Sequence, residues 1–386
     1  MSGPLLIDVS RLVGRTLRGR LPTGIDRVCL AYVDRFGSGA RAVVQWRGWR
    51  RIGTAHASRQ LFELLLKPDA GRLQEAARLL VTGFLRPGRD GECHGAIYLN
   101  VGHTGLEAPG LAHWLQAMQA RAVYMVHDLI PLTHPEYCRP GEAQRHGARM
   151  EAMLRTGSAV LANSQATLDD LGAFARKRSL PMPLAIAAPL APATLAAGAR
   201  DRPPLEQPYF VVVGTVEPRK NHWMLLHVWR RLAEEMGSGA PHLVMVGQRG
   251  WECENVVDLL ERSEPLRGLV HELPSCSDVQ LAQYLVHARA LLFPSFTEGY
   301  GLPLVEALML GTPAIASALP AFAEAAGQVP EYLDPLDGPA WTQAVRDYMQ
   351  PEHPRRAAQV MRLQQFRAPT WAQHFERVDP LLESLG

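Results

Sequence analysis

The sequence predicts an α/β protein with two doubly wound domains, and three observations lead to that fold. Short apolar stretches alternate along the chain with amphipathic stretches of helical period. Several apolar stretches run directly into glycine turns or polar residues, as parallel strands of βαβ units do. The chain has 386 residues, which is more than one ordinary domain needs and enough for two.

The C-terminal half shows the alternation most clearly. Asn221 and Asp278 each stand just before an amphipathic stretch, so we expect them to cap helices. Helices between short strands predict a parallel sheet, with ligands bound at the carboxyl ends of the strands. The predicted strands are Tyr209–Val213, Leu243–Val246, Leu291–Phe293, Pro313–Ala316 and Glu331–Leu333.

The N-terminal half repeats this pattern less clearly, and an Ala- and Pro-rich stretch, Ala187–Pro208, reads as a linker. We therefore predict domains at residues 1–200 and 201–368, followed by an amphipathic helix over 369–386 that either is a plain packing helix or crosses back to the first domain. The predicted strands of this half are Leu5–Asp8, Ala42–Trp46, Ala96–Asn100, Ala122–Val126 and Ala159–Ala162.

Composition argues against several classes of protein. A net charge of +2 gives no reason to expect a nucleic-acid partner. No apolar run reaches the roughly 18 residues of a membrane-spanning helix, and the first residues make a poor signal peptide. The five cysteines lie far apart without a C-x-x-C pair, which is typical of free thiols in a reducing compartment. We expect a cytoplasmic protein.

The most informative segment is Leu291–Pro313, LLFPSFTEGYGLPLVEALMLGTP. A buried strand precedes a loop with Glu298, and a helix with Pro303 in its first turn carries Glu306. The free N–H groups at the helix start suit an anion, and the two carboxylates suit hydroxyl groups. A nucleotide sugar, which has both phosphates and hydroxyls, fits this combination.

A second segment, Val211–His222, reads as a strand, a turn at Gly214, the basic pair Arg219-Lys220 and a helix start. Only three of the 40 basic residues are lysines, and Lys220 is the one in the C-terminal half. Two cations at a helix start could hold a diphosphate, or they could be a surface pair after an ordinary turn. The first segment, in the same domain, favours the diphosphate.

These segments resemble the signature of the retaining GT-B glycosyltransferases of glycosyltransferase family 4, and of its mannosyltransferase-type members in particular. That family carries a Glu-x7-Glu motif, here in FPSFTEGYGLPLVE, and an Arg/Lys pair, here in EPRKN. TGIDRV near the start and VHDLIPLTHPE in the middle resemble elements of the family's N-terminal domain. The resemblance implies two Rossmann-like domains facing across a cleft, with the acceptor on the N-terminal domain and the nucleotide sugar on the C-terminal one.

The resemblance also implies a role for each matching residue. Arg219 and Lys220 would neutralise the leaving diphosphate, Glu298 would bond the transferred sugar, and His127 would face that sugar. Glu306 would hold the ribose. The remaining predicted donor contacts are Gly24, Gly214, Thr215, Gly299, Tyr300, Gly301 and Leu302. Thr215 stands where some members carry an arginine, so Arg219 or a basic residue elsewhere would carry that load.

The implied reaction retains the anomeric configuration, by front-face attack in which the leaving phosphate takes the acceptor's proton. The chain has no Asp-x-Asp motif, so we predict no metal and no other cofactor, with cations and a helix end in place of a metal. The predicted donor is GDP-mannose, from the chain-level resemblance. The predicted acceptor is a glycan or a lipid-linked glycan of a surface polysaccharide.

The N-terminal half offers further candidates near the predicted acceptor. His127 and Asp128 end a strand, and His103 follows another in VGHTG. His127 could contact sugar, be structural, or bind a metal together with His134. Asp128 could orient the ring of His127 or cap the next turn. His103 could line the acceptor side or belong to an ordinary turn.

The stretch Trp46–Ile52 mixes tryptophan with arginine. We interpret it as a weak peripheral contact with the inner membrane face, or as a solvated basic loop. The arginines of this hypothesis are Arg11, Arg15, Arg18, Arg20, Arg47, Arg50 and Arg51.

Three other functions remain open from the residues alone. A glycoside hydrolase could use Glu298 and Glu306 as its carboxylate pair, but it has no use for the basic pair. A pyridoxal-phosphate enzyme could hold its cofactor on Lys220, and a nucleotide-sugar-binding or scaffold protein could keep a degenerate site. For the transferase we expect Lys220→Ala to abolish turnover with little loss of stability.

Overall fold

The computed structural model describes residues 4–19, 22–46, 48–67, 72–84, 90–193, 195 and 202–386. The chain forms two compact units. Unit 1 comprises Met1–Leu132, Pro140–Leu190 and Trp371–Gly386, and unit 2 comprises Thr133–Arg139 and Ala191–Thr370. Within the described residues, no helix is both long enough and apolar enough to cross a membrane.

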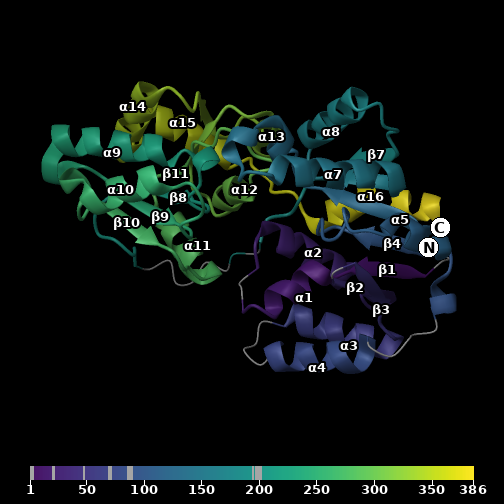
Figure 1. The fold of residues 1–386 in the computed structure, drawn as a ribbon. Helices are drawn as coiled ribbons and strands as arrows, with labels where there is room; N and C mark the ends of the chain where they lie inside the picture. The colour runs from purple at the N-terminus through teal and green to yellow at the C-terminus, as the bar shows by residue number, and fades with distance from the viewer. Residues whose placement is uncertain are drawn as a thin grey trace. The chain divides into compact units, whose positions relative to one another are not determined.

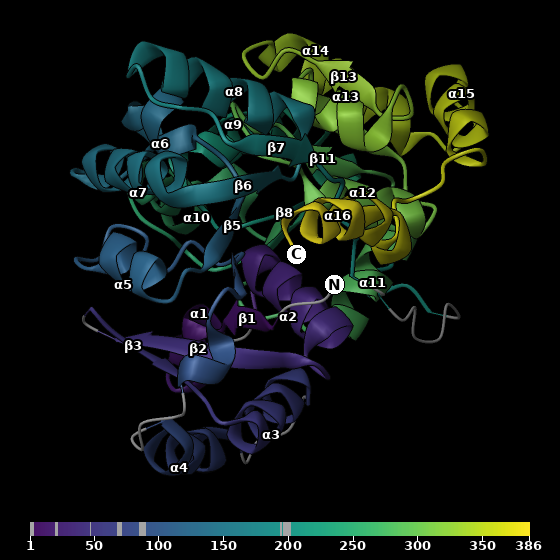
Figure 2. The same ribbon diagram turned by 90° about the vertical axis from the view of Figure 1, so that its right-hand side faces the viewer.

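Unit 1 contains a seven-stranded sheet in the order β3-β2-β1-β4-β5-β6-β7. All neighbouring strands are parallel except β2 and β3, which form an antiparallel hairpin. The strands are β1 (Leu5–Asp8), β2 (Ala40–Trp46), β3 (Trp49–Ile52), β4 (Ile97–Asn100), β5 (Arg121–Val126), β6 (Gly157–Ala162) and β7 (Leu184–Ala187). Figure 2 shows the hairpin at one edge of the sheet, with α3 and α4 beneath it.

The helices of unit 1 connect successive strands, as βαβ units require, except for the C-terminal helix α16. They are α1 (Ser10–Thr16), α2 (Gly24–Phe36), α3 (Ala55–Leu66), α4 (Arg72–Phe84), α5 (Leu111–Ala117), α6 (Ile130–Thr133), α7 (Glu142–Thr156), α8 (Gln165–Lys177) and α16 (Trp371–Leu385). The C-terminal helix α16 packs on α2: Tyr32 Oη lies 2.8 Å from His374 Nε2, and Arg35 pairs with Asp379 at 2.6 Å.

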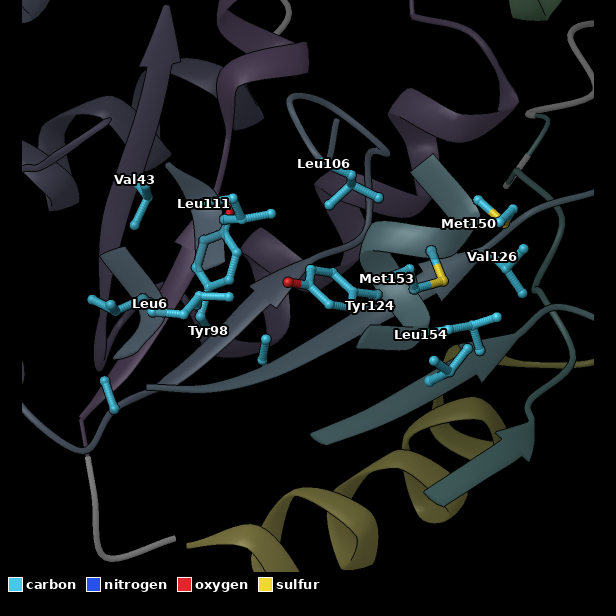
Figure 3. Packing of buried hydrophobic residues seen from close by; sticks show 14 of the residues in the cluster. Leu6, Val43, Tyr98, Leu106, Leu111, Tyr124, Val126, Met150, Met153 and Leu154 are labelled. Carbon is cyan, nitrogen blue, oxygen red and sulfur yellow. The ribbon is translucent and has the colours of Figure 1, made fainter. Parts of the chain in front are cut away.

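The core of unit 1 on one side of the sheet is built from strand and helix side chains together (Figure 3). Tyr98 and Tyr124 of neighbouring strands belong to the same cluster as Met150 and Met153 of α7. Each of these four side chains is fully buried. Burial of side chains of this size stabilises the unit by roughly 1.5–3 kcal/mol each.

Unit 2 contains a six-stranded, fully parallel sheet in the order β10-β9-β8-β11-β12-β13. Its strands are β8 (Tyr209–Val213), β9 (His242–Val246), β10 (Val270–Leu273), β11 (Leu291–Phe293), β12 (Ala314–Ser317) and β13 (Glu331–Leu333). The chain builds outward from β8 on one side and from β11 on the other. The carboxyl ends of β8 and β11 therefore form the topological switch point, where such sheets bind ligands.

The helices of unit 2 are α9 (His222–Met236), α10 (Glu254–Arg262), α11 (Asp278–His287), α12 (Leu302–Met309), α13 (Pro320–Ala326), α14 (Gly338–Met349) and α15 (Pro354–Leu363). Helix α9 packs against α10 and α14 (Figure 1). The apolar face predicted for α9 is buried, with Leu225, Trp229 and Leu232 each fully covered.

Both predicted helix caps of unit 2 were wrong in their details. Asn221 adopts a left-handed conformation (φ 57°), and its Nδ2 donates to Pro335 O at 2.8 Å instead of capping α9. The N-cap of α11 is Ser277, not Asp278, because Ser277 forms a capping box with Gln280. Which residue caps a helix depends on the local backbone angles. The sequence does not give these angles, so it cannot tell which of two adjacent polar residues is the N-cap.

Three strands were absent from the sequence prediction: β3, β7 and β10. The interpretation of Trp46–Ile52 as a solvated loop is wrong for β3, whose side chains alternate between exposed and buried. Arg20 and Arg47 of the predicted membrane patch lie outside the described residues, as does most of 194–201 in the predicted linker.

Candidate functional site

The switch point of unit 2 brings together the two segments singled out in the sequence. The loop after β8 ends in the short helix Pro218–Lys220, and the loop after β11 carries Ser295 and Glu298. The two loops are joined by a backbone hydrogen bond from Phe296 N to Arg219 O at 2.8 Å. The basic pair and the first carboxylate, 78 residues apart in sequence, are therefore in direct contact.

These side chains form an ion-pair cluster, which we define as Glu217, Arg219, Lys220 and Glu298. Arg219 Nη1 lies 2.8 Å from Glu298 Oε2, and its Nε lies 2.7 Å from Glu217 Oε1. Lys220 Nζ donates to Glu298 Oε1, which also accepts a hydrogen bond from Ser295 Oγ at 2.9 Å. Lys220 and Glu298 are almost fully covered, with side chains 10% and 9% exposed.

The cluster fixes the charge of its members. Burial by itself would raise the pKa of Glu298, but attraction to Arg219 and Lys220 outweighs it and lowers that pKa to about 2. Burial lowers the pKa of Lys220 below its ordinary value, while Glu298 works against that change. Glu298 is thus an anion at neutral pH, suited to accepting hydrogen bonds and not to acting as a general acid.

Glycine is required beside the cluster for steric reasons. Gly214 has φ 148°, and a Cβ there would lie 3.2 Å from Lys220 Cε, so the glycine leaves room for the lysine. A Cβ on Gly247 would come 2.0 Å from Gly214 O. Gly247 directly follows β9, and the sequence analysis did not name it as a site residue. A glycine directly after an apolar strand could have identified it. Thr215 is exposed next to Gly214.

The second carboxylate lies on α12, as the sequence predicted for Glu306. Its residue is 7% exposed, and Oε1 accepts a long hydrogen bond from Ala193 N at 3.4 Å. Gly301 has φ 95° at the start of α12, and a Cβ there would come 2.6 Å from the ring of Phe322. Gly299 and Leu302 are half-buried, whereas Tyr300 is buried. The glycine turn therefore places backbone, and not a bulky side chain, at this helix start.

One segment from the N-terminal half belongs to this unit. Thr133–Arg139 is part of unit 2, and within it the ring of Tyr137 stacks on Phe296 with centroids 5.3 Å apart and planes 7° apart. Phe296 lies two residues before Glu298. Sequence reasoning missed this contact because no local pattern pairs residues so far apart in the chain.

In unit 1, His127 ends β5, as predicted, and is 5% exposed. Its Nε2 lies 2.7 Å from Val101 O, and Asn163 Nδ2 donates to its backbone carbonyl at 2.8 Å. A carbonyl oxygen only accepts, so Nε2 must carry the hydrogen. Burial lowers the pKa of His127, which leaves a neutral ring with a bare Nδ1 at neutral pH. His127 therefore offers a hydrogen-bond acceptor.

His103 lies beside His127, with ring centroids 5.0 Å apart, and His146 is 6.0 Å from His103. Burial, followed by repulsion from the other two histidines, holds the pKa of His103 well below its ordinary value. His103 has a strained φ of 60°, and among the described residues its buried Nε2 has no hydrogen-bond partner. No group of three or more His, Cys, Asp or Glu in the described part of the chain could hold a metal ion.

Asp128 caps the turn that follows His127, because its Oδ1 accepts from Ile130 N at 3.2 Å. Of the two roles predicted for Asp128, this contact supports the cap. Ser164 caps α8 by accepting from Thr167 N at 3.0 Å.

Gly24 begins α2, next to a buried ion-pair group that the sequence analysis did not identify. Asp26 is 1% exposed, and it pairs with Arg11 and Arg15, each at 2.7 Å. It also accepts from Thr23 N at 2.7 Å, which fixes the start of the helix. Arg11 and Arg15, assigned in the sequence to a membrane patch, are thus held at a helix N-terminus. The available signal was an aspartate three residues after a threonine, as in a capping box.

Comparisons with known proteins give a consistent result. Residues 199–329 match the family described as Glycosyl transferases group 1. The serotype-specific mannosyltransferase WbdA of Escherichia coli is 29% identical over 260 residues, which are 62% of this chain and 32% of that protein. The O-antigen chain mannosyltransferase B of Escherichia coli is 33% identical over 165 residues, or 43% of each chain. This chain thus spans about a third of the length of WbdA.

Two solved structures share the fold over nearly the whole chain. The Anabaena protein Alr3699/HepE, in complex with UDP-glucose, has a TM-score of 0.69 at 14% identity and covers 98% of this chain and 99% of its own. The sucrose-phosphate synthase of Thermosynechococcus elongatus has a TM-score of 0.62 at 17% identity, with 99% of each chain covered. The predicted GT-B fold and the resemblance to mannosyltransferase-like GT-B proteins are confirmed.

Proposed function

We propose that this chain, whose residues 199–329 form a glycosyl transferases group 1 domain within a GT-B fold, is a retaining glycosyltransferase that works without a metal. Its donor would be a nucleoside diphosphate sugar, with GDP-mannose as the first choice. Its acceptor would be a glycan, free or lipid-linked, in the synthesis of a surface polysaccharide. Two of the relatives are named as O-antigen mannosyltransferases, which supports mannose and this acceptor class.

The observation that carries the proposal is the ion-pair cluster at the switch point of unit 2. It holds two cations at the carboxyl ends of β8 and β11, next to the start of α12. An arginine fork, an ammonium and the positive end of a helix together match a diphosphate. Glu298 and Glu306 add acceptors for hydroxyl groups, which a simple phosphate site would not need.

The chemistry follows from the charges that develop when the bond between sugar and phosphate breaks. Positive charge grows on the sugar ring and negative charge on the diphosphate. Arg219 and Lys220 are already fixed by Glu217 and Glu298, so they would stabilise the leaving group with little reorganisation. Glu298, held ionised, would accept hydrogen bonds from the sugar. The diphosphate itself would take the acceptor's proton, in line with retention of configuration.

In unit 1, His127 is the residue that we expect to contact the sugar. Its neutral ring presents Nδ1 as an acceptor, and the hydrogen bond to Val101 fixes the orientation of the ring. We propose that Nδ1 accepts a hydrogen bond from a sugar hydroxyl. His103 and Asp128 would support this residue by packing beside it and by shaping the turn after it.

The base of the donor is the first thing to test. The Anabaena structure contains UDP-glucose, whereas several curated relatives are named mannosyltransferases. A thermal-shift panel with GDP, UDP, dTDP, ADP and CMP, in the presence of a chelator, tests the base and the metal independence together. A ligand at about 100 times its dissociation constant adds roughly 2.7 kcal/mol of stability.

We expect GDP to shift the melting transition and the other nucleotides to shift it less. A variant of the same cluster, Lys220→Met, should lose the shift with every nucleotide. If no nucleotide stabilises the wild-type chain, the motif is a remnant of the fold and a binding or scaffold role takes its place. If UDP gives the largest shift, the transferase stands and the donor assignment fails.

A weak peripheral membrane contact would bring the chain to a lipid-linked acceptor. Its support is the hairpin of unit 1, where Trp46 and Trp49 are 71% and 66% exposed. Tryptophan at this level of exposure suits a membrane interface. Flotation with anionic liposomes tests the contact, and a chain that stays at the bottom of the gradient would rule it out.

A further inference from the structure

A groove in unit 1 lies on the edge hairpin of β2 and β3, and none of the described residues in its walls is assigned to the reaction. It has a volume of about 300 Å³. Its walls include Trp49, Arg50 and Arg51 of β3, Pro109 and Gly110 before α5, and Trp114 of α5. The hairpin forms an edge of the sheet, so this side of the groove is not covered by another strand (Figure 2).

The groove contains a buried cation without a counter-ion. Arg50 is only 7% exposed, and a guanidinium stays charged at any ordinary pH. Its contacts are the carbonyls of Pro109, Ala108 and Gly105, at long distances of 3.4, 3.4 and 3.5 Å. Among the described residues its buried Nε has no hydrogen-bond partner, and no ion pair involves this side chain.

Such an arginine is costly to keep in a folded protein. Buried charges are normally paired, because removal from water is repaid only by an opposite charge and good hydrogen bonds. Here the groove walls supply two arginines and no carboxylate. The charge imbalance therefore points to an anion as the missing partner, in contact with Arg50.

The other walls add an aromatic surface. Trp49 and Arg51, whose guanidinium lies 5.0 Å from the Trp49 ring centroid, project to the exposed face of β3, opposite to Arg50. Trp114 is held by an edge-on contact with Tyr98, with ring centroids 5.3 Å apart. Flat indole rings suit the C–H face of a pyranose ring, which is apolar while its edge carries the hydroxyls. The size is at the lower end of ordinary ligand pockets, enough for one or two sugar units.

We propose that this groove is a second saccharide-binding site, for a hexose unit that carries a carboxylate or a phosphate. The anion binds Arg50, and the sugar ring lies against the indole of Trp114. Identifying this hexose as part of the glycan acceptor rests on the proposed function. The binding itself does not, because neither the donor nor the ion-pair cluster takes part.

The test measures binding of mannose 6-phosphate and glucuronate by ligand-observed NMR on the full chain, with methyl α-mannoside as the neutral ligand. We expect both anionic sugars to bind, and the neutral one to bind at least about tenfold more weakly. Arg50→Met should weaken binding of the anionic sugars at least about tenfold without lowering the melting temperature, because it removes an uncompensated buried charge. Trp114→Ala should weaken the same ligands.

Arg121→Met is the matched control. Arg121 also donates to a carbonyl, that of Gly95 at 2.8 Å, and lies in the same sheet outside the groove, so its loss should leave sugar binding unchanged. Equal binding of anionic sugars to wild type and Arg50→Met overturns the proposal, and so does their failure to bind the wild type. Inorganic phosphate that competes as well as mannose 6-phosphate would show an anion site without sugar recognition.

Two further measurements separate the saccharide proposal from a membrane contact and from the proposed transferase function. Arg50-dependent binding to phosphatidylglycerol vesicles, without binding of the sugars, would make the groove a membrane contact and overturn the saccharide assignment. Nucleotide stabilisation measured on the same Arg50→Met sample reports on the donor site alone. Loss of sugar binding with an intact nucleotide shift supports the groove. In the wild type, a missing nucleotide shift with intact sugar binding counts only against the proposed transferase.

Discussion

Replacing Glu298 with glutamine gives the sharpest test of the ion-pair cluster. The substitution keeps the size of the side chain and removes the negative charge that lies between two cations. Arg219 keeps its partner Glu217, whereas Lys220 loses the carboxylate it pairs with. Lys220 is 8% exposed, so water cannot replace that partner easily. The variant is therefore left with a buried ammonium.

The expected cost can be worked out in two ways. A pKa of about 2 for Glu298, against an ordinary value of 4.5, corresponds to about 3 kcal/mol of favourable interaction at neutral pH. Removing one partner of a buried ion pair costs roughly 3–5 kcal/mol in other proteins. We therefore expect Glu298→Gln to destabilise unit 2 by about 3 kcal/mol.

Hydrogen exchange followed by mass spectrometry suits a chain with two units, because peptides from β8 and β11 report on unit 2 alone. These peptides should lose protection in the single variant. The double variant Glu298→Gln/Lys220→Met removes the stranded ammonium, so it should recover most of the loss. The single variant should also become more stable as pH rises, since Lys220 can then lose its proton.

Two results would refute this reasoning. Wild-type protection in Glu298→Gln would mean that the pair contributes little to stability. A double variant no more protected than the single one would mean that the loss comes from the other contacts of the carboxylate, with Arg219 and Ser295, and not from the stranded charge.

Three further predictions concern the same site. Because the folded-state pKa of Glu298 is lowered, its stabilisation is present above about pH 4.5 and lost as pH falls toward about 2. In that window the melting temperature should fall more steeply in wild type than in Glu298→Gln. Lys220→Ala should reduce turnover by roughly 10²–10³-fold, as loss of one charge-stabilising donor does, in a steady-state assay. The same variant should lose about 3 kcal/mol of stability, because the structure shows a buried, paired lysine and contradicts the small loss expected from sequence. Glu306→Ala should weaken nucleotide binding in a titration while leaving the far-UV circular dichroism unchanged, and equal affinity would remove its ribose role.

The sequence was a good guide to strands that are apolar throughout. β1, β8, β11 and β13 have the predicted limits, because each is a short apolar or nearly apolar run bounded by a turn. The edge strand β3 was missed since its inward positions are Arg50 and Ile52, and a buried arginine resembles a solvated loop in sequence. Local hydrophobic pattern identifies a strand only where burial and apolarity coincide.

The sequence alone also determined which chemical groups the site contains. The Glu-x7-Glu segment and the basic pair were enough to indicate the GT-B fold, which is confirmed, whereas the nucleotide sugar stays a prediction. This succeeded because a loop and the helix after it are local structures, whose glycine, proline and carboxylate positions are set by backbone geometry.

Only the tertiary structure decided how these groups are charged and what they touch. Strand order places β8 beside β11, and this adjacency joins Lys220 to Glu298 and buries both. The stacking of Tyr137 on Phe296 likewise depends on how distant segments pack. Ion pairing, pKa and burial arise from neighbours in space, and the contribution of a lysine to stability cannot be read from the residues beside it in the chain.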